Sequence, residues 1–225
     1  MKRKILIFAP HADDEVIGIG GTLLRHIEQG DDVFVVYITH PKEDFGFESS
    51  FDQKRRHDIS ECIAEIGLSS SDYEILGFEP ATLSNENIRN LIQELKKIVI
   101  NFTADTLYVP NHSDVHSDHY FVAKAADAIS KSFRCESVKR VISYETISET
   151  DVSLLPDGNY KPNLYVNIEK FIEKKLALLR HYKSEMAEPP FPRNARIIKA
   201  HSQWRGSQAG YLFAEAHKIL VYRLD

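Results

Sequence analysis

Short apolar runs alternate with longer amphipathic stretches along this chain, and this alternation is the feature that most limits its fold. The run over 5–9 is apolar at every position, as expected for a strand covered on both faces. Strands that alternate with helices predict a parallel sheet with right-handed crossovers. Further strands are expected at 33–38, 73–78, 106–109 and 138–144, separated by helices at about 15–29, 51–66, 88–99 and 120–133.

The predicted fold class is therefore α/β, with a Rossmann-like, mostly parallel sheet and helices on both faces. No linker divides the chain, so we expect a single domain over 1–225, in which 146–225 complete the Rossmann-like half formed by 1–145. The later pattern is weaker. It predicts a polar loop at 146–163, a strand at 164–168, a helix at 170–182, a proline-rich break at 189–192, a helix at 209–216 and a strand at 219–224.

Composition excludes several classes of protein. A chain of 225 residues that is 43% hydrophobic and 27% charged has enough apolar surface to fold. No apolar run approaches the roughly 20 residues that a membrane span needs, and a net charge of −5 gives no electrostatic footprint for nucleic acid. Two isolated cysteines exclude a disulfide scaffold and favour a reducing, cytoplasmic location.

A polar turn with the sequence PHADDE, at 10–15, follows the first strand directly. It lies at the carboxyl end of that strand, where parallel sheets place their functional sites. His11 and Asp14 are spaced to reach one metal ion from a tight turn, which leaves Asp13 free to handle protons. The alternative is a polar turn that caps a helix, because acidic side chains stabilise helix N-termini.

A denser polar loop with the sequence PNHSDVHSDH, at 110–119, follows the fourth strand. Three histidines and two aspartates within eight residues indicate a metal site or an acid–base site. The alternative is a solvated loop in which Asp118 caps the next helix.

The first and fourth strands of a doubly wound sheet are often neighbours, and ligands bind in the crevice between their carboxyl ends. We therefore expect the two polar segments to face one another. Two histidines, one carboxylate and an open fourth position form a common catalytic zinc set. The same donors hold other divalent transition metals, so Zn²⁺ is the expected cofactor with a related ion as the alternative.

The two segments resemble the paired HPDDE and HxDH signatures of the PIG-L/LmbE-like family of zinc-dependent N-acetylglucosaminyl deacetylases. Here they read PHADDE at 10–15 and HSDH at 116–119. The likeness runs from residue 5 to about residue 217. It includes Arg55 in the helix before Gly67, YKSE at 182–185 against the family's YxSQ, and RGSQAGYLFAEA at 205–216 against its RG…AEA tail.

The resemblance implies specific roles. Asp13 would be the general base, and a protonated His116 would stand beside the reacting carbonyl group. Asp118 would orient an imidazole by hydrogen bonding, and Arg55 would bind the substrate. The implied zinc ligands are His11, Asp14 and His119.

The implied reaction is hydrolysis of the acetamide of an N-acetylated amino sugar or glycoconjugate, which releases acetate. Asp13 would take a proton from the attacking water and return one to the leaving amine. Two positions depart from the family pattern. Ala12 replaces the usual proline without removing a ligand, and Glu185 replaces the usual glutamine, a change whose meaning the sequence leaves open.

Two other functions compete with this hypothesis. A metal-dependent phosphoesterase also uses adjacent aspartates and histidines, although few basic residues lie near the expected site to receive a phosphate. A non-catalytic sugar-binding protein is disfavoured because every ionisable residue that the mechanism requires is present. The sequence leaves open the sugar, a homo-oligomeric state, and whether the segment 45–47 forms a lid.

The glycines at 18, 20 and 21 resemble a dinucleotide-binding loop only loosely, because no GxGxxG is present and acidic residues occupy the turn before them. Close packing of a helix on the sheet is the preferred interpretation of these glycines.

Overall fold

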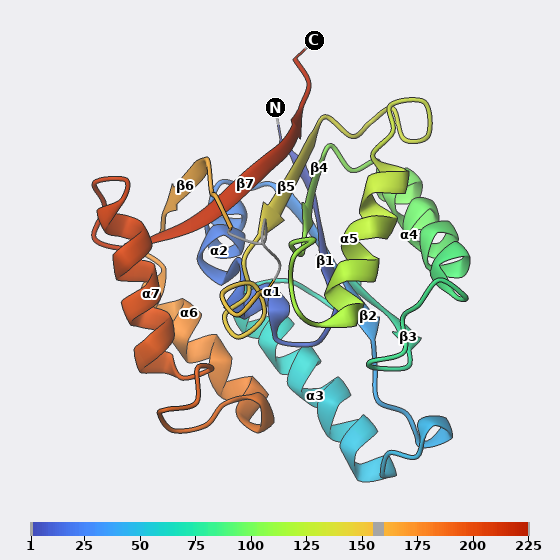
Figure 1. The fold of residues 1–225 in the computed structure, drawn as a ribbon, viewed down its shortest axis with the longest axis horizontal. Coiled ribbons are helices and arrows are strands. Elements are labelled where there is room, and N and C mark those ends of the chain that lie inside the picture. The colour runs from blue at the N-terminus through green and yellow to red at the C-terminus, as the bar shows by residue number, and fades with distance from the viewer. Residues whose placement is uncertain (1, 155–159, 225) are drawn as a thin grey trace.

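The computed structural model describes residues 2–154 and 160–224. Within them one seven-stranded sheet has the order β3-β2-β1-β4-β5-β7-β6 (Figure 1). The strands are β1 (Lys4–Ala9), β2 (Asp32–Thr39), β3 (Tyr73–Phe78), β4 (Thr106–Val109), β5 (Arg140–Tyr144), β6 (Leu164–Asn167) and β7 (Ala214–Tyr222).

Helices cover both faces of this sheet, as the sequence predicts. Figure 1 shows α4 and α5 together on one side and α6 and α7 on the other. The α-helices are α1 (Asp14–Ile17), α2 (Gly20–Glu28), α3 (Ser49–Ile66), α4 (Ile88–Phe102), α5 (Ser117–Ile129), α6 (Ile172–Leu178) and α7 (Ala195–Ser207), and two 3₁₀ segments are η1 (Glu43–Phe45) and η2 (Leu179–Glu185).

The side chains of β1 alternate between the two faces of the sheet, and this explains why the hydrophobic core has two layers. Ile5 and Ile7 belong to a buried cluster that includes residues of α2, α3 and α6, whereas Leu6 belongs to a second cluster with residues of α4 and α5. All three side chains are fully buried. A strand covered on both faces reads as a continuous apolar run because successive side chains point to opposite faces.

The topology places the candidate site at the carboxyl ends of β1 and β4. β1 pairs in parallel with β2 on one side and with β4 on the other. The connection after β1 leads to β2 on one side, whereas β4 and the strands after it lie on the other side. This reversal of strand order leaves a crevice at the carboxyl ends of β1 and β4. The adjacency of the first and fourth strands, expected from the sequence, is confirmed.

The predicted helix at 209–216 is wrong. The chain forms α7 (Ala195–Ser207) earlier, in a stretch to which we assigned no element, and Ala214–Tyr222 is β7. β7 lies antiparallel between β5 and β6 and supplies backbone hydrogen bonds to both. Alanine and glutamate favour helices in isolation, but this pairing within the sheet outweighs their weak preference.

The expected helix at about 15–29 is divided into α1 and α2, and close packing explains the glycines around the division. A Cβ atom on Gly18 would lie 2.5 Å from the Tyr144 ring, and one on Gly21 would lie 2.6 Å from Ile168. These glycines let the helices approach the neighbouring side chains, as the preferred interpretation predicts.

A buried ion pair joins β7 to the helices behind the first polar turn. Glu215 accepts hydrogen bonds from the backbone N–H groups of Gly21 and Thr22 at 2.8 and 2.7 Å, and from Lys175 Nζ at 2.6 Å. Lys175 Nζ also donates to the Ile17 carbonyl at 2.9 Å. The pair thereby ties α1, α2, α6 and β7 together.

Replacing Lys175 with methionine is expected to lower the free energy of unfolding by about 3–5 kcal/mol, because the Glu215 charge is left buried without its partner. Chemical denaturation measures this change. The matched control is Lys170→Met, since Lys170 pairs with Glu28 at the surface and such pairs contribute at most about 1 kcal/mol. Equal effects of the two substitutions would contradict the structural role of the buried pair.

Two further properties follow from the described residues. Cys62 and Cys135 are both free and buried, where each packs as a small hydrophobic side chain. Within residues 2–154 and 160–224, no helix combines the length and the apolar character needed to cross a membrane.

Candidate metal centre and active site

The first polar turn leaves β1 and enters α1. The Asp14 carboxylate accepts a hydrogen bond from the backbone N–H of His11 at 2.8 Å, which closes the turn. Asp13 has a φ of 154°, a conformation that side-chain-bearing residues rarely adopt. Such backbone strain concentrates at functional sites, where the surrounding structure maintains it.

The second polar loop leaves β4 and enters α5. His116 is the N-cap of α5, and its Nδ1 accepts a hydrogen bond from the Asp118 backbone N–H at 3.1 Å. Asp118 and His119 lie in the first turn of the helix, so both side chains are held close to the sheet. Both are fully buried.

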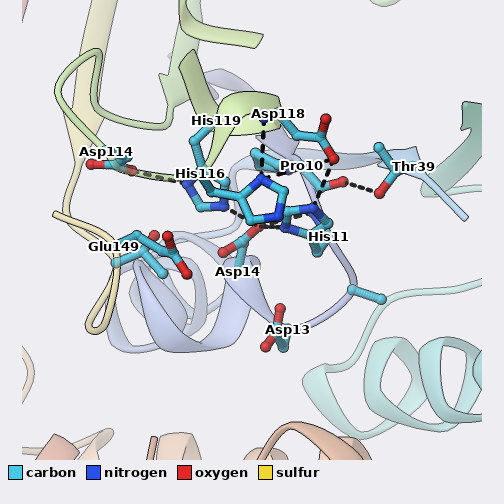
Figure 2. A network of polar contacts seen from close by, with 12 residues as sticks. Pro10, His11, Asp13, Asp14, Thr39, Asp114, His116, Asp118, His119 and Glu149 are labelled. Atoms are coloured by element: carbon cyan, nitrogen blue, oxygen red, sulfur yellow. Dashed lines mark hydrogen bonds and ion pairs between the residues drawn. The ribbon is translucent and has the colours of Figure 1, made fainter. Parts of the chain in front are cut away.

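The fold brings the two segments together, as Figure 2 shows. His119 Nε2 lies 3.3 Å from Asp14 Oδ2, and His11 Nδ1 lies 3.4 Å from the same oxygen. Donor atoms of these three residues all lie within 4.8 Å of one another, so that one ion can reach them all. His11, His116 and Asp118 form a second group of the same kind beside it.

The chemistry of the donors fits a divalent ion. His119 Nδ1 donates to Asp114 Oδ2 at 2.9 Å, so the lone pair is on Nε2. That Nε2 atom is buried, has no hydrogen-bond partner among residues 2–154 and 160–224, and faces Asp14. Two imidazoles and one carboxylate suit zinc, and a carboxylate behind a ligating histidine is the usual supporting contact.

The electrostatics of the cluster also favour a cation. Burial alone would lower the pKa of His11, but hydrogen bonds to Asp118 and Asp14 raise it to about 9. Burial alone would also lower the pKa of His119, but the charges of Asp14 and Asp114 and its hydrogen bonds to them raise it to about 10. The carboxylates therefore favour a cation at this position, which is a proton on each imidazole without metal and a metal ion that displaces those protons when it binds.

Asp118 contacts His11 more closely than it contacts His116. Asp118 Oδ2 lies 3.1 Å from His11 Nε2 but 3.9 Å from His116 Nδ1. The same carboxylate accepts hydrogen bonds from the backbone N–H groups of Ala81 and Leu83 at 2.7 and 3.1 Å. Asp118 therefore holds both the His11 ring and the loop after β3.

Asp13 lies beside the cluster rather than within it. Burial and the charge of Asp14 raise its pKa to about 8, against the opposing charge of Arg193. Arg193 Nη1 donates to Asp13 Oδ2 at 3.2 Å. The ion pair with Arg193 thus holds the buried carboxyl group at the edge of the donor cluster.

A cavity of about 240 Å³ opens onto this cluster. Arg55 lies in its wall, where the resemblance places a substrate-binding residue, and its Nη1 donates to the Ala12 carbonyl at 3.0 Å. Of the segment 45–47, Phe47 lines the cavity. The lining residues are His11, Ala12, Asp13, Thr39, Pro41, Phe47, Phe51, Arg55, Pro80, Ala81, His116, Glu185 and Arg193.

Three residues of the site were assigned no role from the sequence. Asp114 belongs to the polar loop that the sequence identifies, so its carboxylate was a detectable signal. Arg193 follows the proline-rich break, and Glu149 lies in the region expected to be an irregular loop. Arg193 Nη2 donates to Glu149 Oε1 at 2.7 Å, a contact that no sequence spacing predicts.

Replacing Asp114 with asparagine is expected to weaken metal binding by about 10–100-fold, because contacts behind the ligands contribute on that scale. Competition with a chelator measures the affinity. Asp127→Asn is the matched control, since Asp127 lies on the same helix as His119 and contacts only the exposed His112 among the ionic partners in the described structure. Unchanged metal affinity in Asp114→Asn would show that the hydrogen bond between Asp114 and His119 does not strengthen metal binding.

The fold and this cluster define a class of protein: a Rossmann-like α/β protein with a candidate metal centre at the switch point of its sheet. Residues 6–130 match the model of the PIG-L family, described as GlcNAc-PI de-N-acetylase. The chain belongs to the PIG-L family.

Individual relatives cover most of the chain. A probable N-acetyl-α-D-glucosaminyl L-malate deacetylase 2 of Bacillus cereus is 25% identical in an alignment of 197 residues that covers 82% of this chain and 84% of the relative. The N,N'-diacetylchitobiose deacetylase of Pyrococcus horikoshii superposes with a TM-score of 0.77 at 22% identity, covering 97% of this chain and 84% of that one.

The fold by itself does not select the reaction. A 4-carboxy-2-hydroxymuconate hydratase of Pseudomonas putida superposes with a TM-score of 0.73 at 15% identity, covering 100% of this chain and 98% of that one. The reaction therefore depends on the side chains of the site.

Proposed function

We propose that this protein is a zinc-dependent hydrolase that removes the acetyl group from an N-acetylated amino sugar or its conjugate. The observation that carries the proposal is the convergence of His11, Asp14 and His119 beside Asp13, at the cavity of a PIG-L family chain. The family description and the deacetylase relatives support an N-acetylglucosamine-like substrate. We also propose that 1–225 act as one catalytic domain, because β6 and β7 extend the same sheet.

The proposed metal ligands are His11, Asp14 and His119. Zn²⁺ bound to them would supply Lewis acidity toward a carbonyl oxygen and toward water. Asp118 would orient the His11 ring, and Asp114 would orient the His119 ring, because each carboxylate lies within hydrogen-bond distance of its imidazole.

Asp13 is the proposed general base. Its carboxyl group lines the cavity but lies outside the donor cluster. The charge of a bound metal ion would lower its pKa of about 8, so that the carboxylate form could accept a proton from the attacking water. Returning that proton to the nitrogen of the broken amide bond would release the amino sugar as an amine. Arg193 would hold Asp13 in place during both transfers.

His116 is the proposed hydrogen-bond donor to the acetamide oxygen. Because its Nδ1 accepts the Asp118 backbone hydrogen bond, the proton of the neutral ring is on Nε2. Burial and, to a lesser extent, the charge of His11 lower the pKa of His116 to about 4. The donor that we propose is therefore the neutral imidazole rather than the protonated form implied by the resemblance. Such donors typically contribute about 3–4 kcal/mol to transition-state stabilisation.

The test is an assay of the zinc-loaded protein against a substrate panel. The panel contains N-acetylglucosamine, neutral N-acetylglucosaminides and N,N'-diacetylchitobiose for acetate release, and sugar phosphates for phosphate release. We expect acetate without phosphate. Phosphate release would favour the phosphoesterase instead, and tight sugar binding without any release would favour the non-catalytic sugar-binding protein.

A further inference from the structure

The outer wall of the cavity carries two arginines that already have carboxylate partners. Arg55 Nη2 donates to Glu185 Oε1 and, at 3.2 Å, to Ser184 Oγ. Arg193 pairs with Glu149 and Asp13, and its Nη1 lies 3.9 Å from Glu185 Oε2. Glu185 therefore lies between the two cationic side chains, with 29% of its own side chain exposed.

We propose that Glu185 sets the charge specificity of the cavity: by neutralising the arginine wall, it selects substrates that are uncharged around the sugar ring and rejects those with an anionic aglycone. This inference rests on the proposed function and names its substrate class more narrowly. Glu185 is also the position at which the chain departs from the glutamine of the family pattern.

Without Glu185 the Arg55 guanidinium would lack a carboxylate partner and could receive a carboxylate or phosphate, whereas Arg193 would keep Glu149 and Asp13. Arginine presents a planar set of donors that matches those groups, and Arg55 is oriented toward such a partner by its bond to the Ala12 carbonyl. With Glu185 present, an incoming anion has to displace a carboxylate and leave it partly buried without a partner. The Glu185 carboxylate therefore disfavours anions in two ways: its charge repels them, and it already occupies the Arg55 donor that would bind them.

Glu185 is ionised at neutral pH. Burial alone would raise its pKa, but the hydrogen bond and the charge of Arg55 hold the pKa of Glu185 below its usual range. A carboxylate with an exposed oxygen accepts hydrogen bonds from sugar hydroxyl groups, which are neutral donors. The same residue that repels an anion is therefore suited to bind a neutral sugar.

An apolar surface completes the wall. The rings of Phe47 and Phe51 are nearly parallel, with centroids 6.0 Å apart and an interplanar angle of 14°. The Arg55 guanidinium lies 5.6 Å from the Phe51 ring centroid, which further restricts its motion. Aromatic faces pack against the C–H groups of a sugar ring, and this contact requires no charge on the ligand.

The test compares two acetylated substrates on the zinc-loaded wild type and Glu185→Gln. One is methyl N-acetylglucosaminide, which is neutral, and the other is N-acetylglucosaminyl malate, which is a dicarboxylate. We expect the wild type to prefer the neutral substrate, and we expect Glu185→Gln to raise the ratio of kcat/KM for the anionic over the neutral substrate by about tenfold. This gain should shrink at high salt, because screening weakens charge attraction.

Glu173→Gln is the matched control, because Glu173 forms an exposed ion pair with Lys199 and does not line the cavity. It should leave the ratio unchanged. A parallel fall of both kcat/KM values in Glu185→Gln would overturn the proposal, since it would show that Glu185 only supports Arg55. A wild-type preference for the anionic substrate would also overturn it.

Calorimetry with the two deacetylated products separates this inference from the proposed function, because binding needs no turnover. Suppose that acetate is released but Glu185→Gln changes neither the kcat/KM ratio nor the relative affinity for the two products. That result would refute the role of Glu185 and leave the deacetylase intact. No acetate release, together with tighter binding of glucosaminyl malate to Glu185→Gln, would refute the deacetylase and support the charge specificity.

Discussion

Asp13→Asn is expected to lower kcat/KM for acetate release by about 10²–10⁴-fold, which is the range that general acid–base catalysis contributes. Asparagine matches aspartate in size, and its oxygen still accepts the Arg193 hydrogen bond. It cannot take a proton from water at neutral pH. The loss should fall on turnover, measured as acetate released by zinc-loaded protein.

The zinc content of Asp13→Asn shows whether the loss of turnover comes from the missing carboxylate or from missing metal. Asp13 is not among the donors of either candidate metal group in the described structure, so Asp13→Asn should bind zinc as the wild type does. Asp127→Asn is the matched aspartate control on the exposed face of α5 and should retain full activity. Full turnover by Asp13→Asn with normal zinc content would remove Asp13 from the mechanism.

His119→Ala is expected to weaken zinc binding by more than about 100-fold, beyond the effect of contacts that only orient a ligand. The substitution removes the buried Nε2 that faces Asp14. Metal analysis after equilibrium dialysis measures the loss, and circular dichroism verifies that the variant is folded. His119→Gln is the second variant, because its amide partly fills the space and contacts Asp114 without supplying an imidazole.

His112→Ala is the matched control for this loss. His112 belongs to the same polar loop, but it pairs with Asp127 at the surface. Its removal should leave the zinc content unchanged, so the order of effect should be His119→Ala, then Asp114→Asn, then His112→Ala. Full zinc occupancy in folded His119→Ala would reject the ligand assignment.

The first five strands and the two signature segments were predictable because their signals are local. A strand buried on both faces is apolar at every position, and Ile5–Ala9 shows this pattern without reference to the rest of the chain. The histidines and aspartates of the two turns are dense enough to be recognised in the sequence. The parallel topology then predicted that the turns would meet.

The C-terminal part was harder to predict, because its structure depends on distant partners. Glu215 was expected in a helix, but it lies in β7 and is fixed by Lys175 and by the start of α2. Arg193 reaches Asp13 across 180 residues of sequence. Neither contact leaves a periodic signal, since each depends on a single side chain placed by the packing of several elements.

The sequence by itself determined the fold class, the family resemblance and the residues of the two polar turns, because hydrophobic period and residue type act over a few positions. Only the tertiary structure decided which carboxylate supports which imidazole, and which side chains surround Asp13 and Arg55. These arrangements depend on distances of a few ångströms between segments that the chain brings together only after the sheet has formed, and electrostatic contacts change steeply over that range.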